Sequence, residues 1–392
     1  MIKIIFAIFQ TGAQSNGGVE SITQIIEHLS AVKPIIVTQI KTPVNQRWEN
    51  FGFDVHIWPI SYKIGTPFGL NIFSKLSRIS SLVDTNYKTW KLIRETGTQI
   101  WHCNDPSAFW HTAFGAWVGK AKIIFNVRDV KPTSEKYSWK WHIAFQISNY
   151  QVVLSQEMRD VLIQRLSIPV SRQPRIKYIY SIVNHVKFHP ILSEQKEWLR
   201  QELGIEPGVF AIGYVANFNH KKQQLEFIQA AGKHLKAQLP HAKVYFIGDF
   251  EPENNTYAHE CWEAVSQQDL QEVCSFLGFQ SNIAAWYQAL DLVIVPTKNE
   301  GLARCMIESL ACGTPVISFN VCSAQEILIN YNCGSVVPMG DYSVLVSEIV
   351  RFAQDEQLMS RYRENAAKVS HKLFSEKNVS EYEKIYNQIL KY

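Results

Sequence analysis

Short apolar runs rich in β-branched residues alternate with amphipathic stretches along almost the whole chain. An apolar run of about four to eight residues indicates a buried strand, and apolar residues spaced three and four apart indicate a helix. Near-continuous apolar strands that are each followed by a helix are typical of parallel sheets covered on both faces. The pattern therefore predicts an α/β protein.

The predicted strands fall into two series, which predict two doubly wound domains. The strands are expected at 2–9, 35–40, 53–60, 99–103, 122–127, 151–154 and 177–182, and then at 209–216, 242–247, 273–277, 292–295, 315–319 and 335–337. The break between the series falls in the polar stretch 184–202, so we expect domains over 1–185 and 200–374. Open α/β sheets bind ligands beyond the carboxyl ends of their strands, which makes a cleft between two facing sheets the expected site.

Composition supports a globular protein with two cores, since 46% of the 392 residues are hydrophobic and 19% are charged. No apolar stretch reaches the roughly 18–20 residues that span a bilayer, and the apolar start is too short for a signal-peptide core. The seven cysteines form no Cys-x-x-Cys pair. A zinc site and a disulfide framework are therefore not indicated, and a reducing cytoplasm is expected.

The charges are unevenly distributed. Residues 1–190 hold 22 basic and 11 acidic residues, whereas residues 191–392 hold 17 basic and 24 acidic ones. This asymmetry predicts that the first half meets something anionic, with chance partition over a long surface as the alternative. The segments 73–94 and 134–145 mix cations with aromatic residues, which fits either an anionic membrane surface or an aromatic core face with solvated lysines.

Two glutamates eight residues apart, Glu300 and Glu308, are the most informative polar pair in the chain. Glu300 follows an apolar strand pattern, and Glu308 is expected about two turns into the next helix. At about 1.5 Å per residue their carboxylates would be about 12 Å apart, whereas a glycosidase pair needs about 5–9.5 Å. This spacing favours holding the two ends of a long ligand, such as a nucleotide sugar whose diphosphate sits on the helix N-terminus.

Three further segments are candidates for binding or chemistry. The glycine-rich run 10–18, which includes Gly17 and Gly18, precedes a predicted helix and favours an anion, although an ordinary turn is equally compatible. Lys222 precedes the predicted helix 223–239, where a lysine opposes the helix dipole; the alternatives are an anionic ligand and a solvated surface lysine. His102 ends a predicted strand and is either a catalytic residue or a packed core histidine.

The run 276–338 resembles the family-4 retaining glycosyltransferases, which have the GT-B fold. It contains Leu277-Gly-Phe-Gln, Ala289-Leu-Asp291, Val295-Pro-Thr, Glu300-Gly301, Glu308 and Ala311-Cys-Gly-Thr-Pro-Val-Ile317. The segments 213–222, 17–18 and 374–386 match more loosely, so the resemblance extends over nearly the full length. It implies two facing Rossmann-like domains with an interdomain cleft. The first would be the acceptor side, with a C-terminal helix over 375–392 packing back on it, and the second would bind a nucleotide sugar.

The resemblance also implies roles for individual residues. Glu300 would contact the donor sugar and Glu308 the ribose hydroxyls. The backbone amides of Leu302 and Ala303 would meet the diphosphate, and Lys222 would stabilise the leaving group. Gly17 and Gly18 would form a phosphate loop in the first domain.

The sequence departs from the family pattern at several of these places. Asn217 stands where the family commonly has an arginine, and Ala303 stands where it has a second glycine. Of the family's His-x-His stretch only His102 remains, with Asn104 at the other position. We hypothesise that Arg304 supplies the charge that Asn217 lacks.

The implied activity is retaining transfer of a hexose from a nucleotide-diphosphate sugar to a glycan or lipid-linked acceptor, in cell-surface polysaccharide or glycolipid synthesis. No Asp-x-Asp motif is present, so neither a metal nor another cofactor is expected. A sugar-nucleotide epimerase of the same fold and a non-catalytic nucleotide-sugar-binding protein are the alternatives. No nucleic-acid partner is expected. A cytoplasmic location is expected, with peripheral attachment to the inner face of the plasma membrane as a hypothesis.

Overall fold

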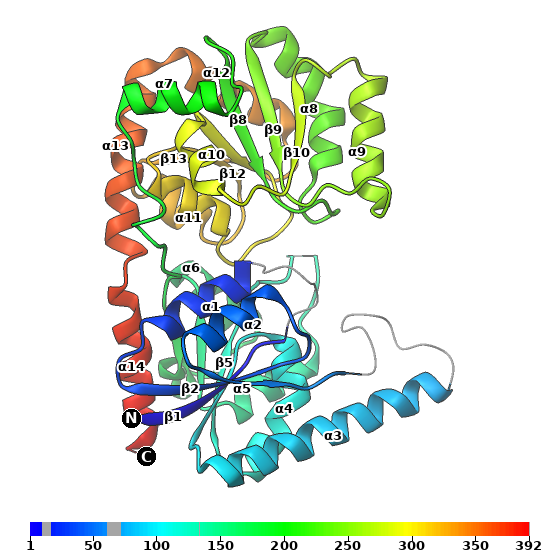
Figure 1. Ribbon diagram of the computed structural model, residues 1–392, viewed down its shortest axis with the longest axis vertical. Coiled ribbons are helices and arrows are strands. Elements are labelled where there is room, and N and C mark those ends of the chain that lie inside the picture. The colour runs from blue at the N-terminus through cyan, green and yellow to red at the C-terminus, as the bar shows by residue number, and fades with distance from the viewer. Residues whose placement is uncertain (10–16, 61–71, 133, 392) are drawn as a thin grey trace. The chain divides into compact units, whose positions relative to one another are not determined.

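The computed structural model describes residues 1–9, 17–60, 72–132 and 134–391, apart from the side chains of 72–74. The chain divides into two compact units, the first comprising residues 1–182 and 376–392 and the second residues 183–375. Each unit is built on one parallel β-sheet with helices packed over it (Figure 1).

The first unit contains seven parallel strands in the spatial order β3-β2-β1-β4-β5-β6-β7. Their bounds are β1 (Ile2–Ala7), β2 (Val32–Thr38), β3 (Asp54–Ile57), β4 (Ile100–Cys103), β5 (Lys122–Asn126), β6 (Tyr150–Val153) and β7 (Ile176–Tyr178). The register places Phe6 of β1 beside Ile36 of β2 and His102 of β4. The order reverses between β1 and β4, which is the arrangement of a doubly wound sheet.

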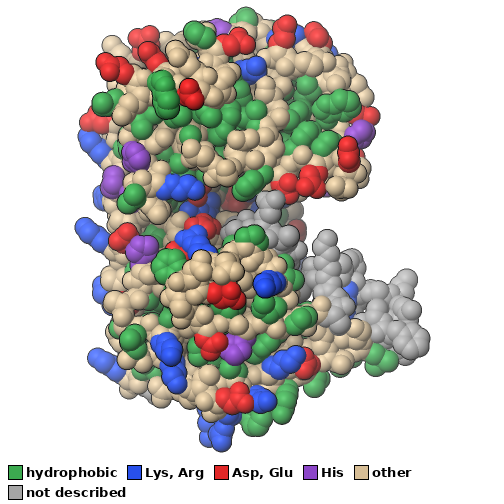
Figure 2. Space-filling model, viewed as in Figure 1, with side chains coloured by type: hydrophobic (Ala, Val, Ile, Leu, Met, Phe, Trp, Pro, Cys, Tyr) green, Lys and Arg blue, Asp and Glu red, His purple; other side chains and the backbone are tan. Residues whose placement is uncertain are grey.

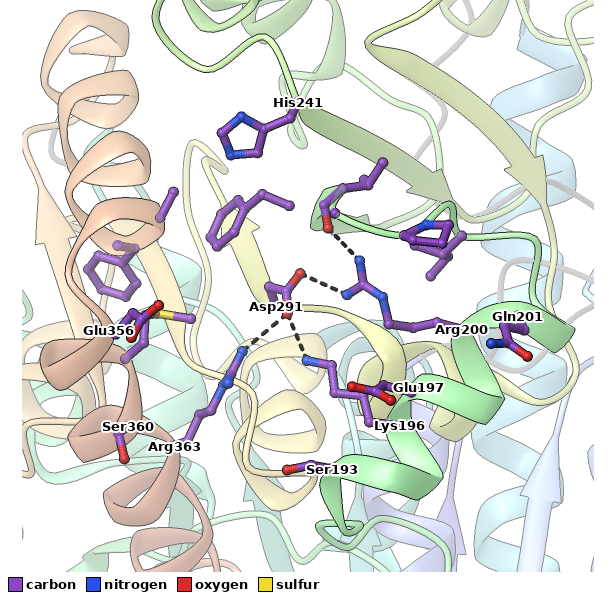
Figure 3. Close-up of a pocket in the computed structure, with 18 residues that line it drawn as sticks. Ser193, Lys196, Glu197, Arg200, Gln201, His241, Asp291, Glu356, Ser360 and Arg363 are labelled. Carbon is purple, nitrogen blue, oxygen red and sulfur yellow. Dashed lines mark hydrogen bonds and ion pairs between the residues drawn. The ribbon is translucent and has the colours of Figure 1, made fainter.

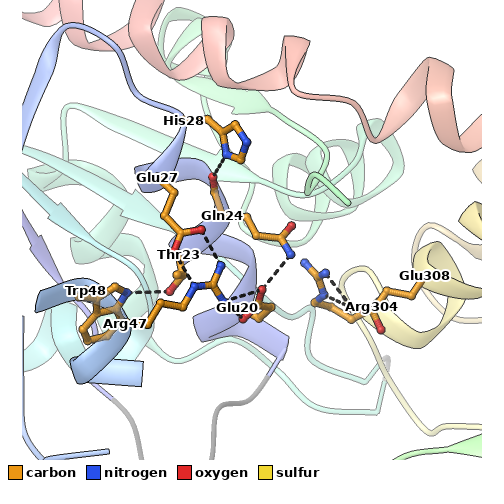
Figure 4. Close-up of polar contacts among 9 residues, drawn as sticks. All are labelled: Glu20, Thr23, Gln24, Glu27, His28, Arg47, Trp48, Arg304 and Glu308. Atoms are coloured by element: carbon orange, nitrogen blue, oxygen red, sulfur yellow. Dashed lines mark hydrogen bonds and ion pairs between the residues drawn. The ribbon is translucent and has the colours of Figure 1, made fainter. Parts of the chain in front are cut away.

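The helices of the first unit are α1 (Gly17–Glu27), α2 (Pro43–Asn50), α3 (Ile72–Thr96), α4 (Pro106–Val118), α5 (Trp139–Ile147), α6 (Gln156–Arg165) and α14 (Lys377–Leu390), with a 3₁₀ turn at Val170–Arg175. The C-terminal helix α14 packs Tyr382 and Tyr386 into the core that contains Ile4 and Phe6. Helix α2 is fastened to α1, because Arg47 pairs with Glu20 and Glu27 (Figure 4).

The second unit contains six parallel strands in the order β10-β9-β8-β11-β12-β13. Their bounds are β8 (Phe210–Val215), β9 (Ala242–Ile247), β10 (Cys274–Gly278), β11 (Leu292–Val295), β12 (Val316–Phe319) and β13 (Gly334–Val337). The helices are α7 (Ser193–Glu202), α8 (Gln224–Gln238), α9 (Thr256–Gln267), α10 (Ile283–Ala289), α11 (Arg304–Ala311), α12 (Tyr342–Gln354) and α13 (Glu356–Leu373), with a π-helical turn at Gln325–Ile329.

The fold class predicted from the sequence is confirmed. Every apolar run that was predicted to be a strand contains one, and both sheets are entirely parallel. The central strands are buried along their length, as β11 shows, because helices cover both faces. The cleft between the two domains stays a prediction.

Asp291 binds four segments of the second unit together where β11 begins (Figure 3). Its carboxylate accepts hydrogen bonds from Lys196 at 2.8 Å, Arg200 at 2.8 Å and Arg363 at 3.1 Å. It also accepts from the backbone N–H of Ala211 at 2.9 Å. Burial raises the pKa of this carboxyl, but the cations and hydrogen bonds outweigh burial and hold the pKa below its ordinary value. Helix α7 is thereby anchored to the second unit.

A cavity of about 890 Å³ opens beside this cluster and is lined by α7, by the start of β8 and by α13. It lies at the edge of the sheet where the strands begin, whereas Glu300 and Glu308 follow the carboxyl end of β11. The cavity is therefore separate from the predicted ligand site, and the basic residues on its wall (Lys196, Arg200 and Arg363) pair with Asp291.

Candidate functional site

The second sheet has its topological switch point between β8 and β11, which are hydrogen-bonded neighbours although two strands lie between them in sequence. Connections leave β8 and β11 toward opposite sides of the sheet, so a crevice opens at their carboxyl ends. Open α/β sheets bind ligands at this crevice. The loops that follow the two strands, residues 216–223 and 296–303, carry Lys222 and Glu300.

These two loops are joined by backbone and side-chain hydrogen bonds. The backbone N–H of Lys298 and the hydroxyl of Thr297 both donate to the carbonyl oxygen of Lys221, at 2.9 Å and 3.0 Å. The hydroxyl of Tyr214, at the end of β8, donates to the carbonyl oxygen of Lys222. The backbone that presents Lys222 is therefore held from the sheet and from the neighbouring loop.

Glu300 lies at the centre of a small ionic cluster. Lys222 donates from Nζ to Glu300 Oε1, although the two residues are 78 positions apart in the chain. Lys221 places Nζ 3.8 Å from Glu300 Oε2, and the hydroxyl oxygen of Thr297 lies 3.3 Å from Oε1. Glu300 is 8% exposed, so its charge requires such partners. The structure thus brings together two residues that the sequence predicted separately.

Lys222 stands directly before helix α8, as predicted. Gln223 forms the N-cap of this helix with φ of 60°, in the left-handed region that residues other than glycine rarely adopt. Such a conformation costs about 1–3 kcal/mol and is typical of functional loops. Here it turns the chain sharply between Lys222 and the first turn of α8.

Glu308 is held by a cation from its own helix (Figure 4). Arg304 donates from Nε and Nη2 to Glu308 Oε1, at 2.9 Å and 2.7 Å. Tyr287, which is fully buried, lies with its hydroxyl 3.4 Å from Oε2. The carboxylate therefore has a cation on one oxygen and a hydroxyl near the other.

The predicted spacing of the two glutamates needs correction. Helix α11 begins at Arg304, because residues 301–303 are not helical, so Glu308 stands just over one turn into the helix instead of two. The helical rise applies to only half of the steps between Glu300 and Glu308. The predicted separation of about 12 Å no longer follows from it.

The N-terminus of α11 lacks a side-chain cap. Ala303 occupies the N-cap position, and its methyl group cannot accept a hydrogen bond from the first turn. Leu302 and Ala303 are 6% and 5% exposed, and the carbonyl of Gly301 accepts a hydrogen bond from Ser323. The turn is thus fixed by packing while the dipole of the helix points out of it.

Asn217 follows the end of β8 and brings no charge to the site. Its side-chain oxygen accepts a long hydrogen bond of 3.4 Å from the backbone N–H of Asp249, and its carbonyl accepts one of 3.1 Å from Gln224. The glycine at 248 is required by this loop, because a Cβ there would lie 2.1 Å from the carbonyl oxygen of Ala216. Asn217 therefore has a clear role in tying the ends of β8 and β9 together.

The first sheet has its own switch point between β1 and β4. Gly17 and Gly18 are the first two residues of α1, whereas residues 10–16 of the predicted glycine-rich loop lie outside the described part. The carbonyl of Gly18 accepts a hydrogen bond of 3.4 Å from Asn104, and Arg128 donates to the side-chain oxygen of Asn104. The first turn of α1 also carries Glu20, whose charge is neutralised by Arg47 (Figure 4).

His102 occupies the core of the first unit and is not presented to a ligand. It is 0% exposed, and its ring nitrogens lie 2.9 Å from the hydroxyl of Tyr386 and 2.9 Å from the amide oxygen of Asn126. Burial lowers the pKa of this histidine to about 3, so the ring is neutral. The structure corrects its assignment as a catalytic residue: this is the packed alternative. Asn104, two residues later, is the residue at the strand end.

The sequence interpretation missed residues whose contacts define the site. Lys221 is the second cation on Glu300, and Tyr287 is the hydroxyl group near Glu308. The pair of adjacent lysines was a visible signal, but Tyr287 carried none, since it looks like any aromatic residue of a helix. Among the described residues, no group of three or more His, Cys, Asp or Glu side chains is arranged to hold a metal ion.

Residues 195–369, which contain every candidate of the second unit, match the family described as glycosyl transferases group 1. The chain is 26% identical over 216 residues to the N-acetyl-alpha-D-glucosaminyl L-malate synthase of Bacillus anthracis, covering 55% of each protein. It is 23% identical over 239 residues to the UDP-Gal:alpha-D-GlcNAc-diphosphoundecaprenol alpha-1,3-galactosyltransferase of Escherichia coli, covering 60% of this chain and 59% of that protein. Together these matches show that the chain is similar to glycosyltransferases.

The chain spans between about half and two-thirds of the length of these curated relatives. Other relatives are named for capsular polysaccharide and lipopolysaccharide core synthesis. Among solved structures, Anabaena HepE in complex with UDP and glucose superposes with a TM-score of 0.80 at 17% identity, over 100% of both chains. This likeness confirms the two-domain Rossmann-like fold.

We expect the stability of the first unit to depend on the neutral state of His102. The unfolded chain takes up a proton below pH 6.5, the ordinary pKa, while the folded protein does not until about pH 3. The stability that the neutral ring contributes is therefore fully present above pH 6.5 and is lost as the pH falls. The free energy of unfolding is expected to drop by about 2 kcal/mol between pH 7 and pH 5. Denaturant unfolding of the wild type and of His102→Gln at both pH values measures it.

The variant is expected to show a smaller loss of stability on acidification than the wild type. His259→Gln is the matched control, because His259 lies on the surface of α9 with its side chain 49% exposed. Equal pH dependence in the wild type and His102→Gln would contradict the burial of a neutral ring.

Proposed function

We propose that the protein is a retaining, metal-independent glycosyltransferase. It moves a hexose from a nucleotide-diphosphate sugar to a glycan or a lipid-linked acceptor, in cell-surface polysaccharide or glycolipid synthesis. The observation that carries the proposal is the contact between Lys222 and Glu300 at the switch point of the second sheet, next to the uncapped start of α11.

The donor would lie across this crevice with its diphosphate at the N-terminus of α11. A helix N-terminus offers backbone N–H groups and a partial positive charge to phosphate oxygens. The ribose would lie at Glu308, whose carboxylate can accept from two hydroxyls, and the sugar would lie at Glu300. Leu302 and Ala303 would supply the turn that approaches the phosphates, and Asn217 would line the end of β8.

In the reaction, the bond between the anomeric carbon and the donor phosphate oxygen breaks while the acceptor oxygen bonds to that carbon. Negative charge builds on the departing diphosphate and must be neutralised. Lys222 and the N-terminal dipole of α11 would supply the compensating positive charge, and Arg304 would add its guanidinium in the first turn of the helix. These cationic groups are the reason for proposing transfer without a metal.

We propose retention because the resemblance of residues 276–338 to retaining glycosyltransferases implies it, and no carboxylate is proposed as a nucleophile. Glu300 is engaged by Lys222, Lys221 and Thr297, so it is suited to accepting hydroxyl protons of the sugar and not to attacking the anomeric carbon. We propose front-face transfer in which the leaving phosphate takes the acceptor proton. The acceptor would then reach the sugar from the side of the leaving group.

The partners follow from the same assignment. The names of the relatives support UDP-sugars and diphosphoundecaprenol-linked acceptors as chemical classes. We propose that Gly17 and Gly18 form a donor-phosphate loop of the first unit, and that the protein works in the cytoplasm at the inner face of the plasma membrane. None of the described helices is long and apolar enough to cross a membrane.

Sugar transfer is tested in two steps. A thermal-shift screen with UDP-, GDP- and ADP-sugars identifies the donor, because a ligand at 100 times its dissociation constant stabilises the protein by about 2.7 kcal/mol. The donor is then incubated with membrane lipid extract, and the product linkage is read by NMR. We expect transfer with the donor's anomeric configuration kept; an inverted product would contradict retention.

Variants separate transfer from the alternatives. Lys222→Met is expected to lower the transfer rate at saturating donor by about 100-fold or more, because one group that stabilises the developing charge is lost. Lys298→Met is the matched control, since Lys298 lies three residues past β11 and its side chain pairs with Glu226 at 3.4 Å. Donor binding without turnover would indicate a binding protein, and release of sugar without acceptor would indicate an epimerase.

We predict that Arg304 contributes to donor affinity in place of the arginine missing at position 217. Arg304→Ala is expected to weaken binding of the sugar nucleotide by about tenfold, the equivalent of one charge-assisted hydrogen bond worth about 1.5 kcal/mol. Isothermal titration with the donor found by the screen measures the change.

Arg361→Ala serves as the control, because Arg361 is exposed on α13 and its guanidinium lies 5.6 Å from the centre of the Tyr362 ring. Glu308→Gln keeps the side-chain shape and removes the charge, so its donor affinity measures the proposed ribose contact separately. Unchanged affinity in Arg304→Ala would show that its only role is to pair with Glu308.

A further inference from the structure

Helix α3 carries large apolar side chains on its solvent-facing side. Leu76, Ile79, Val83, Tyr87 and Trp90 are 55%, 55%, 64%, 58% and 37% exposed. Their spacing of three and four residues places them on one face of the helix, over a length of about 21 Å. Figure 2 shows hydrophobic side chains gathered along this part of the first unit.

The inward face of the same helix is polar over residues 78–89 and becomes apolar only near its end, where Leu92 and Ile93 are 6% and 3% exposed. Arg78, Thr85 and Thr89 are 8%, 2% and 0% exposed. The two threonine hydroxyls donate to the backbone carbonyls of Ser81 and Thr85, one turn earlier, at 2.6 Å and 2.8 Å. A surface helix of a globular protein normally turns its apolar stripe toward the core, and α3 departs from this rule over residues 76–90, where the large apolar side chains face solvent. A contiguous exposed apolar face of this kind marks an interaction site.

Helix α4 packs directly against α3 and adds to the exposed apolar surface. Gly115 permits this approach, because a Cβ there would lie 2.2 Å from the carbonyl oxygen of Asn86. The backbone N–H of Gly115 also donates to the side chain of Asn86 at 2.7 Å. Helix α4 exposes Phe114, Trp117 and Val118, which are 64%, 62% and 45% exposed. We call the eight exposed apolar residues of the two helices the α3–α4 ridge.

Charges along α3 indicate which partner fits. The described part of the helix carries five basic and two acidic residues, and Lys75, Lys91 and Arg94 are exposed. A helix with so many charges is unsuited to the hydrocarbon core but suited to the plane of the bilayer interface. Lysine and arginine can extend their charged ends toward headgroups while their aliphatic stems stay against the apolar surface.

The residue types of the ridge agree with that location. Tryptophan and tyrosine, which combine an apolar ring with one polar group, are enriched where a membrane meets water. The interface with a second protein would instead be depleted of lysine around its core. Tyr87, Trp90 and Trp117 on the ridge, with Lys75 and Lys91 on α3, therefore favour an anionic bilayer over another copy of the chain.

We propose that the α3–α4 ridge docks on the surface of an anionic lipid bilayer, with α3 lying in the plane of the interface. This inference rests on the proposed function for its use, since a bilayer is where a lipid-linked acceptor would be met. The docking itself depends only on the apolar and basic side chains of the first unit. It can be tested without any sugar transfer.

The test is co-sedimentation of the full chain with vesicles of phosphatidylcholine alone and of phosphatidylcholine mixed with phosphatidylglycerol. We expect sedimentation with the mixed vesicles and weaker sedimentation at high salt, because screening weakens the attraction to anionic headgroups. Trp117→Ala is expected to lower vesicle binding by about tenfold, as loss of one large buried apolar side chain predicts.

Trp198→Ala is the matched control, because Trp198 of α7 in the second unit is also 62% exposed. It is expected to bind vesicles like the wild type. Val83→Glu provides a second ridge variant, and Lys91→Glu tests the charge separately. Since the side chains of Trp117, Val83 and Lys91 are all exposed, thermal unfolding is expected to be unchanged and to show that the variants fold.

Three outcomes would overturn the proposal: no sedimentation with mixed vesicles, equal binding to neutral vesicles, or equal loss in Trp198→Ala and Trp117→Ala. Light scattering of the same variants measures the oligomeric state and so tests a second copy of the chain as the occupant. If the wild type is a dimer that does not bind vesicles, and the ridge variants are monomers, the ridge is a dimer interface. Vesicle binding with no sugar-nucleotide binding would reject the proposed function and keep the ridge. Sugar transfer without vesicle binding would reject docking by the ridge and keep the proposed function.

Discussion

The neutralisation of Glu300 is the constraint on which the rest of the site depends. A carboxylate that is 8% exposed is costly unless cations and hydrogen-bond donors surround it. Lys222 and Lys221 meet this requirement only because the loops after β8 and β11 are hydrogen-bonded to each other. That contact in turn requires β8 and β11 to be neighbours, which is what the strand order of a doubly wound sheet provides.

The same arrangement places several positive groups at one end of the sheet without a metal cluster among the described side chains. The lysines precede α8, the start of α11 has no side-chain cap, and Arg304 stands in its first turn. The dipole of each helix disfavours a cation at its N-terminus, and Glu300 and Glu308 offset this by pairing with the lysines and with Arg304. Under the proposed function, these groups would stabilise the negative charge of a departing diphosphate.

Much of the fold was predictable, because strands buried on both faces leave continuous apolar runs that a sequence shows directly. The helix start at Arg304 was not, since the apolar spacing of Leu302 and Met306 looks helical although residues 301–303 form a turn. His102 was misassigned for a related reason. A residue near a strand end can lie above or within the sheet, and only packing against α14, far away in sequence, shows that it is buried.

Contacts between distant segments explain what else the sequence could not show. Lys222 and Glu300 were both candidates, but their contact depends on strand order and not on spacing. For the outward apolar face of α3, the sequence showed the residue types but not the direction in which they face. Its cations and aromatics were visible in the sequence, yet whether they faced the core or solvent depended on the burial of Thr85 and Thr89 beneath them.

A crystal structure with the sugar nucleotide selected by thermal shift would test the central claim most directly. The account predicts phosphate oxygens within hydrogen-bond distance of Lys222 and of the first N–H groups of α11, the ribose at Glu308 and the sugar at Glu300. Binding of the nucleotide in the cavity beside Asp291, or with the sugar at Glu308 and the ribose at Glu300, would contradict it.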